Sequence, residues 1–234
     1  MGFGIAHLEE PAYSEFELRV EQAEMGIASG PALVFLVDGE DLFGRTLGLK
    51  GVGRDPDDLL GRTSPLLPPE SPHQPPTTLL WRCDCGVEGC GFASARIEND
   101  RFNNDYDHIV WTDFTVHCLG DVEPPRELRF RTRQYVAEIV RCHADRTWET
   151  DLRRIAREVA AALDAEPGIL GQWDCGLRWA KPHERAGQVY VLVTDGSAEY
   201  STSHDGAAGA AEIISRLRAT DPRESAEHTY PRPG

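Results

Sequence analysis

The order of short apolar segments along this 234-residue chain constrains its fold more than any other feature. Three such segments, at 77–85, 90–98 and 107–114, follow one another and are connected by GVEG and by the polar stretch NDRFNNDY. Short connections of this kind join neighbouring antiparallel strands, whereas parallel strands need a longer crossover. The sequence therefore predicts three consecutive antiparallel strands.

Two further groups of strands lie on either side of this region. Residues 15–20 alternate apolar and polar side chains, and 32–37 is a continuous apolar run that ends at an Asp-Gly turn. Towards the C-terminus, 173–179 alternates again, and 188–194 and 198–203 flank a second Asp-Gly dipeptide, which is typical of a hairpin. These segments predict strands near the N-terminus and a β-meander near the C-terminus.

Helices are predicted where apolar residues recur at helical spacing. The first places Tyr135, Ile139 and Cys142 on one face, the second spans 152–163, and the third packs residues 213–217. No regular alternation of strand and helix is present. The expected fold class is therefore α+β, with antiparallel sheets or meanders, two central helices and a C-terminal helix.

The predicted domain organisation has two lobes and a tail. Residues 1–125 form a β-rich lobe with a cysteine hairpin, and 126–220 form an α+β lobe that is either separate or continuous with the first. Residues 221–234 are expected to be a flexible tail. Within the first lobe, 62–76 contains six prolines, which predicts a loop or linker.

The charge balance limits the classes of partner. Asp and Glu number 39 against 24 Lys and Arg, which gives a formal net charge of −15. Contacts to phosphates need basic patches, so a general nucleic-acid binder is not expected. A basic protein partner fits this charge, although acidity also serves solubility. All basic residues except Lys50 and Lys181 are arginine, a bias typical of GC-rich bacterial genomes.

Location is inferred from what the sequence lacks. No apolar run reaches the roughly 18 residues of a membrane helix, and MGFGIAHLEEP resembles neither a secretory signal nor a myristoylation site. A cytoplasmic location is therefore expected. Thiols stay reduced there, and clustered cysteines bind metal more often than they form disulfides.

Three of the six cysteines, Cys83, Cys85 and Cys90, lie within eight residues around GVEG. Strand residues two apart project to the same face, and a four-residue hairpin turn sets Cys85 opposite Cys90. The three thiols are then expected to converge. Thiolate-rich tetrahedral sites select Zn²⁺ or an iron–sulfur cluster, and structural Zn²⁺ almost always has four ligands.

The fourth ligand is predicted from strand register. If Ile97 pairs with Ile109, Phe92 lies opposite Phe114, and Cys118 falls beside the hairpin on the same face as the other cysteines. A register shifted by one residue favours His117 instead. Cys118 is ranked first and His117 second.

Other interpretations of the cluster remain open. Cys85 and Cys90 are close enough for a disulfide or redox pair, and the thiols could also be unmodified. Four protein ligands make a structural centre, whereas three ligands and a water could activate a nucleophile, with His117 or Asp113 near the metal. Cys142 and Cys175 lie on apolar faces and are expected to be core residues.

The segment 83–114 is similar to one shared by uncharacterised proteins of GC-rich bacteria. They have a C-x-C-G-x-x-G-C hairpin, a strand that ends in ARI, and a W-x-D-F motif. The matching residues here are Cys83, Cys85, Gly86, Gly89, Cys90, Ala95–Ile97, Trp111, Asp113 and Phe114. The resemblance implies that the hairpin is a recurring design, and it implies no activity.

Motifs of catalysis and nucleotide binding are missing from the sequence. There is no G-x-x-x-x-G-K-[ST], H-E-x-x-H or G-x-S-x-G, and the acid–base candidates are a cluster of Asp105, Asp107 and His108, together with His117. No catalytic residue is assigned. The expected function is that of a partner-binding protein with a structural zinc site, and the alternative is a metal- or thiol-dependent enzyme with an open cysteine-ligated site.

Overall fold

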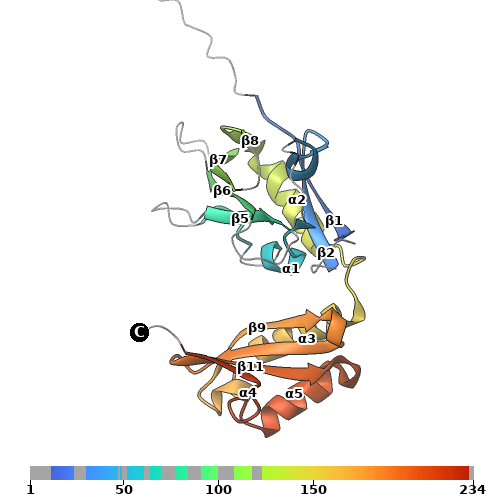
Figure 1. Ribbon diagram of the computed structural model, residues 1–234, viewed down its shortest axis with the longest axis vertical. Coiled ribbons are helices and arrows are strands. Elements are labelled where there is room, and N and C mark those ends of the chain that lie inside the picture. The colour runs from blue at the N-terminus through green and yellow to red at the C-terminus, as the bar shows by residue number, and fades with distance from the viewer. Residues whose placement is uncertain are drawn as a thin grey trace, which may run out of the picture. The chain divides into compact units, whose positions relative to one another are not determined.

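The computed structural model describes residues 12–23, 30–46, 48, 52–60, 64–69, 77–83, 91–99, 108–117 and 123–231 (Figure 1). The chain divides into two compact units, Met1–Trp148 and Glu149–Gly234, called here the first and the second unit. All strand pairings are antiparallel, and helices accompany the sheets in both units. The predicted α+β fold class is confirmed.

The first unit contains two antiparallel sheets, with strand orders β1-β2-β3 and β4-β5-β6-β7-β8. The strands are β1 (Phe16–Ala23), β2 (Gly30–Val37), β3 (Glu40–Asp41), β4 (Val52–Gly53), β5 (Thr77–Arg82), β6 (Phe92–Asn99), β7 (His108–His117) and β8 (Leu128–Arg131). The helical segments are the π-helical turn η1 (Leu42–Thr46), the short α1 (Pro56–Leu59) and α2 (Thr132–Ala144). The three consecutive strands predicted from the sequence are β5, β6 and β7, neighbours in one sheet.

Aromatic side chains fill the core of the first unit. Phe16 stacks on Tyr135, with ring centroids 4.4 Å apart, and both contact Trp111 and Phe130. Trp111 Nε1 donates a hydrogen bond to the Tyr135 hydroxyl (3.1 Å), which donates to the carbonyl oxygen of Leu66 (2.8 Å). Leu66 is fully buried although it lies in the proline-rich segment. Its backbone therefore forms part of the core and is not a peripheral linker.

The register between β6 and β7 differs from the predicted one. Ile97 lies opposite Trp111, where Ile109 was expected, and Phe92 lies opposite His117, where Phe114 was expected. A shift by an even number of residues keeps the same side chains on the buried face, so the apolar pattern alone cannot exclude it. A bulge between Ser94 and Arg96 adds one more residue to the shift.

In the second unit, the strands of residues 149–231 form one sheet with strand order β12-β11-β10-β9. Its strands are β9 (Gly176–His183), β10 (Gln188–Thr194), β11 (Ala198–Asp205) and β12 (His228–Pro231). Its helices are α3 (Asp151–Ala165), α4 (Gly168–Gly171) and α5 (Gly209–Ala219), with the short 3-10 turns η2 (Glu184–Ala186) and η3 (Gly206–Ala208). Helices α3 and α5 pack on an aliphatic core that includes Val159, Val191 and Ile213.

Two boundaries differ from those expected. The units separate between Trp148 and Glu149, and not at 125/126, because β8 pairs with β7 and α2 packs on β1. The expected tail after residue 221 includes β12, which pairs with β11 and sets His228 opposite Ser201. The predicted helices lie where the sequence pattern indicates them, but the first strand of the C-terminal meander, expected at 173–179, is β9 at Gly176–His183. No helix in the described ranges is long and apolar enough to cross a membrane.

Candidate metal centre

Strands β5 and β7 end, and β6 begins, side by side at one end of the five-stranded sheet. Arg82 lies opposite Phe92, which lies opposite His117. One residue further along, the N–H of Cys83 donates to the carbonyl oxygen of Gly91 (2.9 Å). A β-carbon at Gly91 would lie 3.3 Å from Cys83 Cβ and 3.3 Å from the carbonyl oxygen of His117. Cys83, Gly91 and His117 thus form one close-packed group, called here the end row.

The two described ligand candidates point to opposite faces of the sheet. Arg82, Phe92 and His117 are cross-strand neighbours and share a face, on which the His117 ring lies 5.6 Å from that of Phe92. Cys83 follows Arg82 in the strand and therefore projects to the other face. It is half-buried and packs against the aromatic core. His117, in contrast, is exposed.

The remaining predicted ligands, Cys85, Cys90 and Cys118, lie outside the described residues. Across the residues that are described, no group of three or more His, Cys, Asp or Glu side chains could hold a metal ion. The centre remains a prediction about four positions, of which the structure describes Cys83.

Of the acid–base candidates that the structure describes, His117 belongs to the end row, whereas Asp113 and His108 lie away from it. Asp113 has a left-handed backbone (φ 49°) at the β6–β7 bulge and forms an ion pair with Arg96 at 2.8 Å. It precedes His117 by four strand residues, a separation of about 13 Å. The ring of His108, at the opposite end of β7, stacks on Tyr13 with centroids 4.5 Å apart. Asp105 and Asp107 lie outside the described residues.

Cys142 and Cys175 belong to the hydrophobic cores of the first and second units, as the sequence predicts. Burial raises the pKa of the Cys142 thiol to about 11 and also raises that of Cys175. Both thiols are neutral near pH 7, and only a thiolate is an effective metal ligand or nucleophile. These two cysteines are therefore suitable controls for experiments on the other four.

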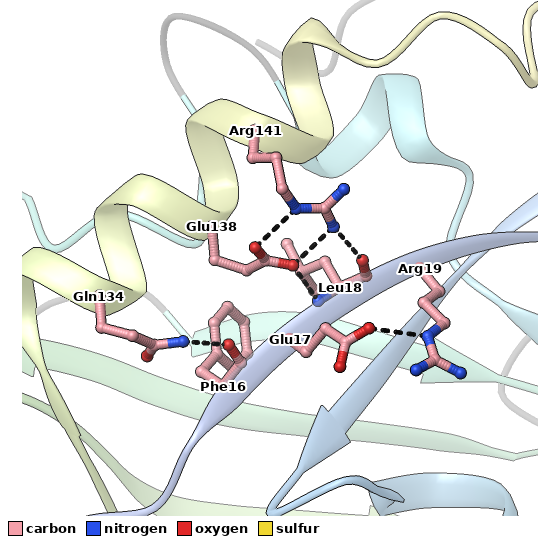
Figure 2. A network of polar contacts seen from close by, with 7 residues as sticks. All are labelled: Phe16, Glu17, Leu18, Arg19, Gln134, Glu138 and Arg141. Carbon is pink, nitrogen blue, oxygen red and sulfur yellow. Dashed lines mark hydrogen bonds and ion pairs between the residues drawn. The ribbon is translucent and has the colours of Figure 1, made fainter.

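The sequence did not predict a polar network that joins helix α2 to strand β1. The Leu18 N–H donates to Glu138 Oε1 (2.7 Å), the Leu18 carbonyl accepts from Arg141 Nη2 (2.7 Å), and Gln134 donates to the Phe16 carbonyl (Figure 2). Helix α2 thus satisfies backbone groups on the outer edge of β1. The only sequence signal is the four-residue spacing between Gln134 and Glu138, which places them on one helix face.

Glu138 is held as a carboxylate by this network. Burial alone would raise its pKa, but hydrogen bonds from Arg141 and from the Leu18 N–H outweigh burial and lower the pKa below its ordinary value. Next to the network lies a pocket of about 460 Å³ between β1 and the C-terminal half of α2.

No protein-family model, curated protein or solved structure matches this chain.

Proposed function

We propose that this chain is a partner-binding protein whose first unit is stabilised by a Zn²⁺ ion held by Cys83, Cys85, Cys90 and Cys118. The observation that supports this proposal is the end row, in which Cys83, Gly91 and His117 lie close together at the ends of three neighbouring strands. Cys90 and Cys118 are each one residue from this row in the sequence, and Cys85 is two.

Chain connectivity limits how far apart these thiols can be. Consecutive Cα atoms are about 3.8 Å apart, and neighbouring strands are about 4.8 Å apart. Sulfur ligands bind Zn²⁺ at about 2.3 Å in a tetrahedral arrangement. Four cysteines within two residues of one row lie within these distances along the chain. Cys90, two residues before Phe92, reaches the face of Cys83 only if the chain turns before Phe92.

Cys118 is proposed as the fourth ligand in preference to His117. The His117 side chain shares a face with Phe92, opposite to the face of Cys83. In an extended strand the next residue projects to the other face, which is the face that a shared site with Cys83 requires. An iron–sulfur cluster would use the same four thiolates, so the metal itself has to be identified.

A closed four-cysteine site leaves no coordination position for a substrate or a catalytic water, so the proposed function is binding. With a formal net charge of −15, the proposed partner is a basic protein. A cytoplasmic location is proposed with it, because the thiolates must stay reduced. An open, enzymatic site would need an acid–base group beside the metal. Asp113 is paired with Arg96, and the side chain of His117 projects to the face opposite Cys83.

Metal content tests the proposal. Protein purified without chelator is analysed by inductively coupled plasma mass spectrometry, and one zinc per chain is expected. Cys83→Ser and Cys118→Ser should lose the metal, because each removes a thiolate. Cys175→Ala, a matched control in the second unit, should retain it. Absence of metal from the unsubstituted protein, or full zinc content in Cys83→Ser, would refute the centre.

A further inference from the structure

Strand β1 is an outer strand of the β1-β2-β3 sheet. In an antiparallel pair, every second residue directs its N–H and C=O away from the partner strand. Leu18 does so, because both of its backbone groups bind side chains of α2 (Figure 2). Val20 and Gln22 follow at the same spacing. Their N–H and C=O groups therefore also point away from β2.

Side chains of helix α2 form hydrogen bonds with the outward backbone groups of β1 only as far as Leu18. Four residues of a helix rise about 6 Å, and two residues of a strand rise about 6.6 Å. Every fourth residue of α2 therefore lies beside every second residue of β1. The matching helix residues are Gln134, Glu138 and Cys142, and the matching strand residues are Phe16, Leu18 and Val20. Cys142, however, has a buried thiol that packs in the core. Among the described residues, no hydrogen bond reaches the outward N–H or C=O of Val20.

The pocket lies beside Val20, where the hydrogen bonds from α2 to β1 stop. The pocket has a volume of about 460 Å³. It is lined by β1 residues 17–21 and by Glu138, Arg141, Cys142 and Asp145. An edge strand with available backbone groups can accept a further strand, and hydrogen bonds to the main chain then supply affinity. The pocket adds room for side chains of such a strand.

Charge indicates which strand the edge accepts. Two carboxylates of the pocket are already paired with arginines, Glu17 with Arg19 (2.8 Å) and Glu138 with Arg141 (2.6 Å). Glu21 and Asp145 add two further negative charges without a further cation in the lining. The C-terminal end of α2, which carries partial negative charge, lies beside them. The pocket thus favours Lys or Arg over acidic side chains.

We infer that an extended basic segment of a partner protein pairs with β1 at Val20 and Gln22 and places a cationic side chain near Glu21 and Asp145. The inference rests on the proposed function only in taking the partner to be basic. It does not depend on the metal.

The probe is a synthetic ten-residue peptide that alternates lysine and valine, titrated into the full chain and followed by amide NMR. Binding should shift the resonances of β1 and the end of α2, and should slow hydrogen exchange of the Val20 and Gln22 amides. The same peptide with glutamate in place of lysine should not bind.

Two variants locate the site. Val20→Pro removes one outward donor without removing a β1–β2 hydrogen bond, and should raise the dissociation constant about tenfold. Glu21→Lys reverses a charge in the pocket and should also weaken binding. Glu224→Lys makes the same charge change in the second unit and should leave affinity unchanged.

Two results would overturn the inference: no binding of the basic peptide, or equal affinity for Glu21→Lys and Glu224→Lys. Metal content is measured on the same samples. A zinc-free chain that binds the peptide at β1 refutes the metal centre alone, and a zinc-loaded chain that does not bind refutes the β1 site alone.

Discussion

The contacts that stabilise the two units join residues at very different separations in the sequence. In the first unit, Leu18 binds Glu138 across 120 residues, and Tyr135 binds the Leu66 carbonyl across 69. In the second unit, β9, β10 and β11 are neighbours both in sequence and in the sheet. Asp195 shapes the β10–β11 turn by accepting hydrogen bonds from Ser197 and Ala198. The second unit also joins distant segments, as when Arg218 pairs with Glu166 across 52 residues, but the contacts of α2 with β1 in the first unit span more than twice that distance.

This difference indicates where an added crosslink would matter. Closing long loops costs conformational entropy, and a metal bound at the end row would link β5, β6 and β7 within the first unit. The second unit has a core of its own and no predicted metal ligand. We therefore expect the two units to respond separately to the changes below.

Removal of the central aromatic side chain should have the largest effect. Trp111→Ala deletes a fully buried indole and should destabilise the first unit by about 3–5 kcal/mol. Ile213→Ala, at the buried centre of the second unit, should cost that unit about 2–5 kcal/mol. Hydrogen exchange resolved by unit measures both effects. Equal loss of protection in both units from either variant would show that they unfold as one.

Metal removal should also lower the stability of the first unit and leave that of the second unchanged. A bound ligand at a thousandfold excess over its dissociation constant stabilises the native state by about 4 kcal/mol, so chelation should lower the stability of the first unit by an amount of this order. Denaturant unfolding with and without a zinc chelator measures it. The second unit serves as the internal control, and an unchanged first unit would contradict a structural role for the metal.

Tyr135→Phe should have a smaller effect confined to the first unit. The hydroxyl accepts from Trp111 Nε1 and donates to the Leu66 carbonyl, and its loss leaves two buried polar groups without this partner. The expected cost is about 1–3 kcal/mol by chemical denaturation. Tyr230→Phe alters an exposed ring of the second unit and should change stability by less than about 0.5 kcal/mol. Equal effects of the two substitutions would show that the buried hydrogen bonds contribute little.

The smallest effect should be a dependence of the stability of the second unit on pH. Burial lowers the pKa of His204, as does nearby Arg216, while Glu227 opposes them. The unfolded state then binds a proton more readily than the folded state, so stability is full above the unfolded pKa of about 6.5 and falls as the pH drops below it. Thermal unfolding from pH 7.5 to 5 measures this trend. His204→Gln should flatten it and the exposed His228→Gln should not; a steep trend in His204→Gln would assign it to other groups.

The elements of the fold could be predicted because their signals are local. Alternation identified β1 and, displaced by three residues at its start, β9. Helical spacing identified α2 and α3, and Asp-Gly dipeptides marked two hairpins. Strand β12 was missed because it has only four residues, all exposed, and so has no buried face to create a pattern.

Contacts between distant segments could not be predicted in the same way. The buried Leu66 lies among prolines, where no periodicity indicates which residue enters the core. The β6–β7 register was wrong because an even shift preserves the buried face and a bulge leaves no apolar signature. For the candidate site, the sequence predicted a strand over 77–85 with Cys85 opposite Cys90, which would set Cys83 opposite Phe92. In the structure β5 ends at Arg82, which lies opposite Phe92, and the orientation of His117 depends on the β6–β7 register.

The most direct test of the account is X-ray absorption at the zinc edge of the purified chain. A closed four-cysteine centre predicts a single shell of four sulfur atoms at about 2.3 Å, with no oxygen or nitrogen ligand. A shell of three sulfur atoms and one oxygen would indicate an open, reactive site. A spectrum without sulfur ligands would contradict the centre itself.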